Sequence, residues 1–347
     1  MASSAKKILT TFGVGFSSAI VASKIRDEFR ARTFKGAVVV ISGGSRGLGL
    51  VLAEKFAKAG ASLALLARDE AELRRAQNII QHRYPETLVH CFVCDCTKTD
   101  EINYTVSDIL DEFGKIDVLV NNAGIISSAP IQNATEEDFE DSLEIHFWAP
   151  YHLIEACRPY LKAGSRIINI ASIGGLVPVP HRAAYCAGKH ALVGYSRTLR
   201  AELLRDKIYV TTVSPSVMRT GSIDHATFKG QVEKEYAWFS LLASLPGLST
   251  NAEKAAQKIV DASKYGKAEL MISASTKIAT VLQARFPNFF SDIVHLANVV
   301  MPGPTDDSDL VVEGKDAHSA ISPSVLTALS EKAALRNNEG SIRGEDH

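Results

Sequence analysis

The chain has 347 residues, of which 46% are hydrophobic and 22% charged, and its formal net charge is −1. This is an ordinary globular composition with enough chain for one large domain or two, and it lacks the basic excess of proteins that bind nucleic acid through the phosphates. The five cysteines are an odd set in a long chain, which favours a reducing, cytoplasmic compartment over a disulfide framework.

The N-terminal segment, residues 1–34, contains sixteen uncharged residues between Lys7 and Lys24. They are too few and too polar for a bilayer span, which needs about 20 apolar residues. Four apolar residues recur at every fourth position: Ile8, Phe12, Phe16 and Ile20. This spacing predicts an amphipathic helix, which either makes peripheral contact with a membrane or packs on the protein itself or on a partner. A secretory signal is disfavoured by the weak cleavage pattern.

Residues 35–275 alternate between short β-branched runs and longer stretches of helical periodicity. Seven runs have the character of buried strands: "AVVVIS", "SLALLA", "LVHCFVCD", "VLVNNAG", "RIINIAS", "YVTTVSP" and "ELMIS". Buried strands that alternate with helices indicate crossover units, so we expect a doubly wound parallel sheet of about seven strands flanked by helices. The alternation lapses after Pro215, and we expect a lid over about residues 218–250.

The cysteine cluster "CFVCDC" invites comparison with a metal site. It lies in a predicted strand, however, where Cys91 and Cys94 would point to opposite faces. No second pair of Cys or His follows at ligand spacing. The pattern therefore favours buried thiols over a metal site.

The C-terminal part divides into two predicted segments. Residues 276–302 form an apolar, amphipathic helical extension that is interrupted at Pro287. Residues 303–347 are polar and rich in turn-forming residues, which predicts that most of them form a mobile tail. The short helical patch "PSVLTALSEKAAL" within them is a candidate for docking elsewhere on the protein.

A glycine-rich turn follows the first predicted strand and opens a helix. Gly43, Gly47 and Gly49 lie in this turn, "SGGSRGLG". Glycine there lets the backbone approach a pyrophosphate, whose charge is favoured by the positive helix N-terminus. A glycine pattern alone is weak evidence, but its place between a strand and a helix makes nucleotide binding the better interpretation.

The spacing Gly-x3-Gly-x-Gly and a series of further motifs resemble the short-chain dehydrogenase/reductase family over about residues 35–273. The motifs fall in this order: "SGGSRGLG", "CDCT", "NNAG", "IASIGG", "YCAGK" and "VSPSVMRT". The resemblance implies a Rossmann-type α/β fold and an NADP(H)-dependent oxidoreductase that interconverts a carbonyl and an alcohol. We also expect a small-molecule substrate and a homo-oligomer.

Cofactor-binding roles are expected for fifteen residues, from the resemblance and, for Arg68, from the charge at the end of the second strand. They are Gly43, Ser45, Arg46, Gly47, Leu48, Gly49, Arg68, Asp95, Asn121, Ala123, Gly124, Tyr185, Lys189, Pro215 and Thr220. Asp95 is expected beside the adenine amino group, and Pro215 and Thr220 at the nicotinamide carboxamide. Asn121, Ala123 and Gly124 are expected to line the cofactor after the fourth strand.

The resemblance also implies a catalytic group of Ser172, Tyr185 and Lys189. Tyr185 and Lys189 stand four residues apart, which stacks them on one face of a helix. Free tyrosine titrates near pH ~10, and a nearby cation favours the phenolate, so Lys189 and an oxidised nicotinamide are expected to lower the pKa of Tyr185. Ser172 would hold the substrate oxygen. The sequence "YAWFSLLASLPGL" in the lid predicts an apolar substrate.

The choice of cofactor follows from charge at the second strand. NAD enzymes of this fold hold the ribose with an acid at the end of that strand. Here the strand ends at Ala67, with Arg68 next and Arg46 in the glycine turn. Two cations suit a 2′-phosphate and predict NADP. The alternative is that Arg68 only begins a helix and that Asp69 serves NAD.

Three residues depart from the family pattern: Ser42, Ser216 and His146. The first two are mild changes. His146 stands where most members carry an asparagine that holds a water and helps to keep a helix locally open. One hypothesis is that His146 relays protons to Lys189 and Tyr185 and adds a pH dependence near neutrality. The other is that it only fills space.

Two other functions remain open at this point. A non-catalytic NADP-sensing or scaffold protein of the same fold is disfavoured by the intact Ser172, Tyr185 and Lys189. An epimerase or dehydratase that retains its cofactor is disfavoured by the glycine spacing.

Overall fold

The computed structural model describes residues 23–244, 249–306, 310–317 and 333–339. A seven-stranded sheet forms its centre, in the order β11-β7-β6-β4-β1-β2-β3, and every pairing in it is parallel. The strands are β1 (Val38–Ser42), β2 (Ser62–Ala67), β3 (Val89–Val93), β4 (Val118–Asn121), β6 (Arg166–Ile170), β7 (Tyr209–Ser214) and β11 (Glu269–Met271). Each lies within one of the seven β-branched runs, so the predicted doubly wound sheet is confirmed.

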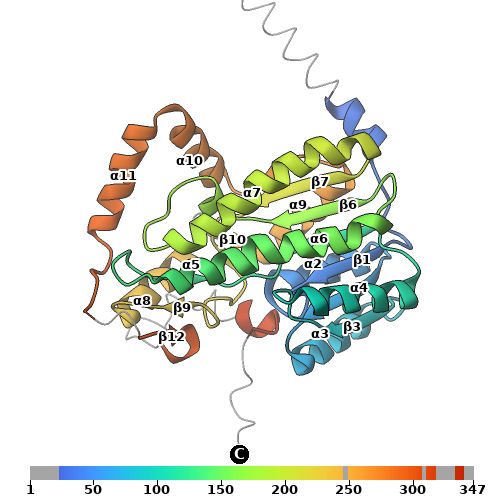
Figure 1. The fold of residues 1–347 in the computed structure, drawn as a ribbon, viewed down its shortest axis with the longest axis horizontal. Helices are drawn as coiled ribbons and strands as arrows, with labels where there is room; N and C mark the ends of the chain where they lie inside the picture. Colours follow the sequence, from blue (N-terminus) through green and yellow to red (C-terminus); the bar gives the residue numbers. More distant parts are fainter. Residues whose placement is uncertain (1–22, 245–248, 307–309, 318–332, 340–347) are drawn as a thin grey trace, which may run out of the picture.

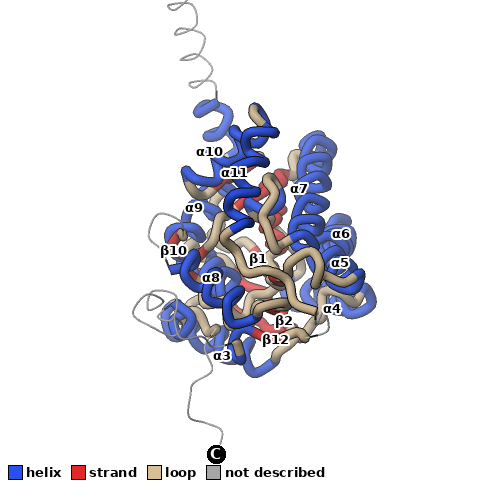
Figure 2. The backbone as a smooth tube through the Cα atoms, turned by 90° about the vertical axis from the view of Figure 1, so that its left-hand side faces the viewer, coloured by secondary structure: helices blue, strands red, loops and turns tan. Residues whose placement is uncertain are grey.

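Helices cover both faces of the sheet (Figures 1 and 2). One layer contains α2 (Gly47–Lys58), α3 (Glu70–Arg83) and α9 (Ala252–Lys264), and the other contains α4 (Thr99–Phe113), α5 (Glu136–Leu143), α6 (Ala149–Cys157) and α7 (Ala183–Leu203). Because successive side chains of a strand alternate between faces, β1 sends Val39 and Ile41 into the first layer and Val40 into the second.

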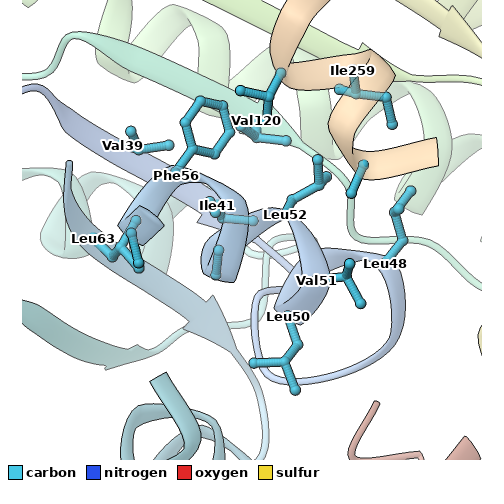
Figure 3. Packing of buried hydrophobic residues seen from close by; sticks show 14 of the residues in the cluster. Val39, Ile41, Leu48, Leu50, Val51, Leu52, Phe56, Leu63, Val120 and Ile259 are labelled. Carbon is cyan, nitrogen blue, oxygen red and sulfur yellow. The ribbon is translucent and has the colours of Figure 1, made fainter. Parts of the chain in front are cut away.

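The core beneath α2 fixes the start of that helix against the sheet. Val39, Ile41 and Val120 of the sheet pack with Leu52 and Phe56 of α2, and all five side chains are fully buried (Figure 3). Burying such side chains contributes about 1.5–3 kcal/mol each before chain entropy is subtracted. The glycine turn that opens α2 is therefore held rigidly at the carboxyl end of β1.

The strand order reverses at β1, which pairs with β2 on one side and with β4 on the other. In open parallel sheets a crevice forms at such a switch point, beyond the carboxyl ends of the strands. The glycine turn after β1 and the "NNAG" segment after β4 both lie at this edge. Here the topology alone places two of the predicted cofactor motifs side by side.

The predicted lid contains short elements in place of the regular alternation. They are β8 (Met218–Arg219), β9 (Thr227–Phe228), α8 (Val232–Ser244) and β10 (Thr250–Asn251). β9 pairs with β5 (Ser127–Ser128) and with β12 (Val312–Glu313). Glu235 of α8 contacts His181, just before α7, at 2.5 Å and accepts a 3.1 Å hydrogen bond from Ser128 of β5, so α8 is tied to both segments.

The predicted C-terminal extension forms α10 (Ala274–Arg285) and α11 (Pro287–Val299), which project from the body of the molecule (Figure 1). The interruption lies at Pro287, the first residue of α11, which suits a side chain that has no backbone N–H to donate.

Two parts of residues 303–347, where a mobile tail was expected, make contacts with the rest of the chain. Strand β12 is paired with β9, and residues 333–339 pack beside the start of α2, where the short red helix lies in Figure 1. Both contacts bury backbone groups against distant parts of the chain, which composition does not reveal.

The apolar stripe predicted within the N-terminal segment lies in residues 8–20, outside the described residues. The described helical residues 23–30 are joined to the core, because Asp27 pairs with Lys267 at 2.5 Å and the Arg30 carbonyl accepts from Arg166. Within the described residues, no helix is both long enough and apolar enough to cross a bilayer.

Candidate active site

The glycine turn has the close backbone packing that a bound phosphate group requires. Gly43 and Gly47 adopt positive φ values of 62° and 57°, a region that favours glycine. A Cβ at Gly49 would collide with the carbonyl oxygen of Gly43. The turn thus presents bare backbone at the N-terminus of α2, as a dinucleotide pyrophosphate needs, and the residues present fit such a cofactor. Leu48, between the last two glycines, is buried.

The turn is clamped to the end of β4 by Asn122, a residue that the sequence analysis did not single out. Its side-chain amide donates to the carbonyl oxygens of Ser42 and Gly43 at 3.2 and 3.0 Å. The backbone N–H groups of Asn122 and Ala123 donate to the Ser42 hydroxyl. The Ser42 hydroxyl, at one of the positions that depart from the family pattern, therefore accepts two backbone hydrogen bonds that hold the turn.

Asn121, by contrast, faces the interior of the sheet. Its amide donates to Asn169 of β6 at 2.7 Å, and Asn169 donates to Ser196 of α7 at 3.0 Å. Asn122 and Gly124 line the pocket described below, whereas Asn121 does not. Adjacent residues of an extended segment point to opposite sides, so the alternation could have shown that only one of the two asparagines faces the pocket.

The end of β2 matches the charge pattern that was predicted for it. The strand ends at Ala67 and the next residue, Arg68, is exposed. The Asp69 carboxylate caps α3 by accepting from the Glu72 N–H at 2.8 Å. The Asp69 carboxylate, which the alternative interpretation assigns to the ribose of NAD, is therefore already engaged as a helix cap.

Asp95 lies just after β3 and accepts from the backbone N–H and the hydroxyl of Thr97 at 3.0 and 2.8 Å. Burial acts to raise the pKa of Asp95, but the two Thr97 hydrogen bonds and the charge of Arg68 hold this pKa below its ordinary value. The carboxylate is therefore ionised and fixed in direction, as an acceptor for an amino group must be.

Arg46 in the glycine turn makes polar contacts with several groups. Its Nη1 pairs with Glu72 of α3 at 2.7 Å and lies 3.2 Å from both ring nitrogens of His225. Its Nε lies 3.6 Å from the carboxylate of Glu339. The Ser45 hydroxyl also donates to Glu72, at 2.9 Å.

Ser172, Tyr185 and Lys189 meet in one pocket. Ser172 lies two residues beyond β6, while Tyr185 and Lys189 lie on the first turns of α7. The ammonium of Lys189 is 5.7 Å from the centre of the Tyr185 ring and donates to the Ile170 carbonyl at 3.0 Å. The backbone N–H of Gly174 donates to the Ser172 hydroxyl. The structure thus brings together three side chains that the sequence separates by up to seventeen residues.

The pKa directions differ from those expected from the Tyr185–Lys189 pair. Burial raises the pKa of Tyr185, although a hydrogen bond with Ser172 and the charge of Arg182 oppose the rise. Burial also lowers the pKa of Lys189 to about 7. Desolvation disfavours the charged form of both groups. The phenol is therefore neutral at neutral pH, and the ammonium titrates near neutrality.

His146 lies in a π-helical turn, Glu144–Trp148, between α5 and α6. Its ring packs edge-to-face on Tyr185 with a centroid separation of 5.1 Å, and its Nδ1 lies 3.2 Å from the Ser142 hydroxyl. Burial and the charge of Lys189 hold the pKa of His146 well below its usual value, so the expected titration near neutrality is not supported.

The pocket has a volume of about 210 Å³. Among the predicted residues it is lined by Gly124, His146, Ser172, Tyr185, Lys189, Pro215 and Thr220. Apolar side chains contribute much of the remaining lining, including Ile126, Val179, Met218 and Phe239. Arg182, which the sequence analysis missed, also lines it and lies over the Phe239 ring at 4.3 Å. Its place one helical turn before Tyr185 could have indicated this position.

Comparison with known proteins agrees with the fold and the motifs. A family model for short chain dehydrogenases matches residues 37–229. The chain is 34% identical over 202 residues to a dehydrogenase/reductase SDR family protein 7-like of Anopheles gambiae, covering 56% of this chain and 63% of that relative. The chain thus spans less than two thirds of the length of this relative.

Two further proteins are similar to the same region. A fatty acyl-CoA reductase of Acinetobacter baylyi is 32% identical over 204 residues, covering 58% of this chain and 68% of that protein. The crystal structure of L-sorbose reductase from Gluconobacter frateurii, complexed with NADPH and L-sorbose, matches with a TM-score of 0.62 at 27% identity, covering 69% of this chain and 95% of that one. With the family model matched over more than half of its length, the chain belongs to the short-chain dehydrogenase family.

Proposed function

We propose that this protein interconverts a carbonyl and an alcohol on an apolar substrate, with NADP(H) as cofactor and Tyr185 as the general acid and base. The observation that carries the proposal is the pocket in which Ser172, Tyr185 and Lys189 meet, at the same sheet edge as the glycine turn. A phenol, a hydroxyl and an ammonium around one apolar space can hold a carbonyl oxygen and exchange a proton with it.

Each of the three side chains has a distinct task in this reaction. The Ser172 hydroxyl donates to the carbonyl oxygen and stabilises the charge that develops on it. Tyr185 gives its phenolic proton to that oxygen during reduction and takes it back during oxidation. Lys189, with a pKa of about 7, compensates the charge of a phenolate when one forms. A nicotinamide cofactor, when bound, supplies or accepts the hydride.

Arg46 and Arg68 are the residues that would select NADP. Arg68 is exposed at the tip of β2, and the nearest acid in sequence, Asp69, is engaged as a helix cap. Two guanidinium groups favour a 2′-phosphate, whereas an acid at this strand end would favour the ribose of NAD. The similar L-sorbose reductase was solved with NADPH, which supports this choice.

The apolar substrate is inferred from the lining of the pocket. Ile126, Val179, Met218 and Phe239 surround the space next to Tyr185, and a small-molecule site of this kind binds mainly through buried apolar area. A similar protein, the fatty acyl-CoA reductase of Acinetobacter baylyi, is named for a substrate with a long alkyl chain. L-sorbose reductase, named for a sugar, shows that the fold alone does not decide the substrate.

The test is steady-state consumption of NADPH or NADH, followed by nicotinamide absorbance, against a panel of apolar ketones and aldehydes. We expect continuous oxidation of NADPH with at least one carbonyl, and loss of that activity in Ser172→Ala. A non-catalytic sensor would bind the dinucleotide without turnover of any carbonyl. An epimerase or dehydratase would return the hydride and show no net consumption, so either result would contradict the proposal.

A further prediction concerns His146. We expect His146→Asn to retain turnover within about threefold, because an amide can also donate and accept at the buried position. His146→Leu should lower kcat about tenfold, because the proton donor Tyr185 loses its edge-to-face partner and some of its orientation.

The pH–rate profile tests the role of His146 directly. Because His146 is neutral across the neutral range, the profile of His146→Asn should overlay that of the unmodified enzyme. A shift of the acid limb in this variant would instead support a proton relay through the imidazole, and an unchanged rate in His146→Leu would show that the ring only fills space.

A further inference from the structure

The C-terminal segment of residues 333–339 lies directly on the glycine turn. The backbone N–H of Gly47 donates to the carbonyl oxygen of Asn337 at 2.8 Å. The side-chain amide of Asn338 donates to the carbonyls of Ser45 and Glu72 at 2.9 and 3.3 Å. These bonds join positions nearly 300 residues apart in the chain, and they engage the turn that the proposed cofactor needs.

The segment is packed tightly against the core. Asn337 donates to the Thr220 carbonyl at 3.1 Å, and both Asn337 and Ala334 are buried. A Cβ at Gly221, which has a φ of 98°, would collide with Ala334. The two segments of the chain therefore approach as closely as a glycine allows. By contrast, Leu335 on the same turn is 70% exposed.

The buried groups of the segment stand where phosphate groups would have to bind. The Gly47 N–H belongs to the first turn of α2. An N–H group in this position has no acceptor within the helix and is a favourable donor to an anion. Here the Asn337 carbonyl takes that bond. A Cβ at Gly47 would meet the Glu339 carboxyl, so this side chain covers the bare glycine face, and the same carboxyl lies 3.6 Å from Arg46.

A pyrophosphate and this segment cannot occupy the turn together. Approach to the backbone of Gly47 requires the space that Asn337 and Glu339 fill, and Arg46 cannot turn toward a 2′-phosphate while it faces Glu339 and Glu72. The segment therefore acts as an internal ligand that satisfies, with a carbonyl and a carboxyl, groups that would otherwise bind phosphate.

We propose that residues 333–339 are an autoinhibitory segment that competes with the dinucleotide for the glycine turn and must leave before the cofactor binds. This inference rests on the proposed nicotinamide cofactor. It predicts that NADPH binds only to molecules in which the segment is undocked. The apparent dissociation constant is therefore the intrinsic constant divided by the undocked fraction. By linkage, the dinucleotide releases the segment to the same extent.

The charges around Glu339 give docking a pH dependence of known sign. Arg46 faces it from the glycine turn, Glu72 from α3, and Asp224 and His225 from the lid. Burial raises the pKa of Glu339 to about 8; Arg46 opposes the rise, and Glu72 and Asp224 add to it. Burial and Arg46 lower the pKa of His225, so this ring stays neutral.

Docking of Glu339 is consequently coupled to proton uptake. A carboxyl whose pKa is higher in the docked than in the free state stabilises docking fully below its free value of 4.5, and this stabilisation is lost as the pH rises through about 8. The segment should therefore inhibit most strongly at acidic pH and least strongly above pH 8.

The test compares two full-length variants with the same added charge. Ala334→Arg places a long cation where the segment touches Gly221 and should evict it, whereas Leu335→Arg adds the same charge on the exposed face of the same turn. NADPH affinity is measured by fluorescence titration, and docking by hydrogen exchange of the Gly47 amide and of residues 333–339.

We expect Ala334→Arg to bind NADPH about tenfold more tightly than the unmodified protein, and Leu335→Arg to bind like the unmodified protein. Saturating NADPH should speed hydrogen exchange in residues 333–339 of the unmodified protein. The dissociation constant of the unmodified protein divided by that of Ala334→Arg should fall from pH 6 to pH 9. Protonation of NADPH itself affects both constants alike and cancels in this ratio.

The other outcomes are distinct. Equal dissociation constants for all three proteins would overturn the autoinhibitory segment and leave the proposed function intact. Weaker binding by Ala334→Arg would make the segment part of the cofactor site and would also overturn the inference. If none of the three binds NADPH or NADH, the autoinhibition and the proposed function both fail.

Discussion

Tyr185→Phe should reduce turnover by about 10²–10⁴-fold and leave the dissociation constant for NADPH unchanged. The substitution removes the proton that Tyr185 exchanges with the substrate oxygen and keeps the ring that packs on His146. Because the pKa of Tyr185 is raised by burial, the phenol is protonated at neutral pH and ready to act as an acid in the reductive direction. The measurements are kcat with the best carbonyl of the panel and fluorescence titration with NADPH.

Tyr195 offers a matched control for this variant. It lies on the same helix, α7, outside the pocket, and its buried hydroxyl has no hydrogen-bond partner among the described residues. Removing an unpaired buried hydroxyl is not expected to destabilise the fold. Tyr195→Phe should therefore retain full activity. If Tyr185→Phe kept most of its activity while Tyr195→Phe lost it, the assignment of the catalytic acid would be wrong.

Arg46→Ala combined with Arg68→Asp should weaken NADP binding by about 10²–10⁴-fold relative to NAD, since each charge-assisted bond to a phosphate contributes about 1.5–3 kcal/mol. The single variant Arg68→Asp should weaken NADP at least about tenfold on the same basis and spare NAD. The measurement is the ratio of the two dissociation constants. This ratio is insensitive to residues 333–339, because they block the glycine turn for both dinucleotides alike.

A charge reversal nearby controls for the general electrostatic effect. Arg74 lies on α3, is 71% exposed in its side chain, and pairs with Glu70 at 2.5 Å. Because exposed charges are screened by solvent and salt, Arg74→Asp should change the NADP/NAD ratio little. Equal affinity of the unmodified protein for the two dinucleotides would contradict the NADP assignment outright.

Much of the architecture was readable from local patterns. Each β-branched run became a strand because Val and Ile fit a buried pleated surface, and the intervening helices provide the crossover connections that parallel strands need. The glycine turn was predictable because positive φ at Gly43 and Gly47 requires that residue type. The spacing of Tyr185 and Lys189 likewise fixed their common face on α7, since a helix repeats every 3.6 residues.

The properties of the site depended on contacts that no local pattern contains. Lys189 and His146 are shifted in pKa by burial, and burial depends on which elements close over a side chain. Asn121 and Asn122 are adjacent and identical, yet only the neighbouring β6 and glycine turn decide which one lies in the sheet and which one clamps the turn.

The C-terminal segment of residues 333–339 shows most clearly the difference between what local patterns predict and what tertiary contacts decide. Its polar composition predicted mobility, because such a sequence buries too little apolar surface to order itself. Residues 333–339 instead form hydrogen bonds with the glycine turn, α3 and the lid, which lie between 117 and 293 residues earlier in the chain. The sequence determined the sheet, the turn and the identity of the reactive side chains, because those follow from short-range periodicity and backbone sterics. Only the tertiary structure decided their protonation and their accessibility, because desolvation and competition for a site arise from contacts between distant parts of the chain.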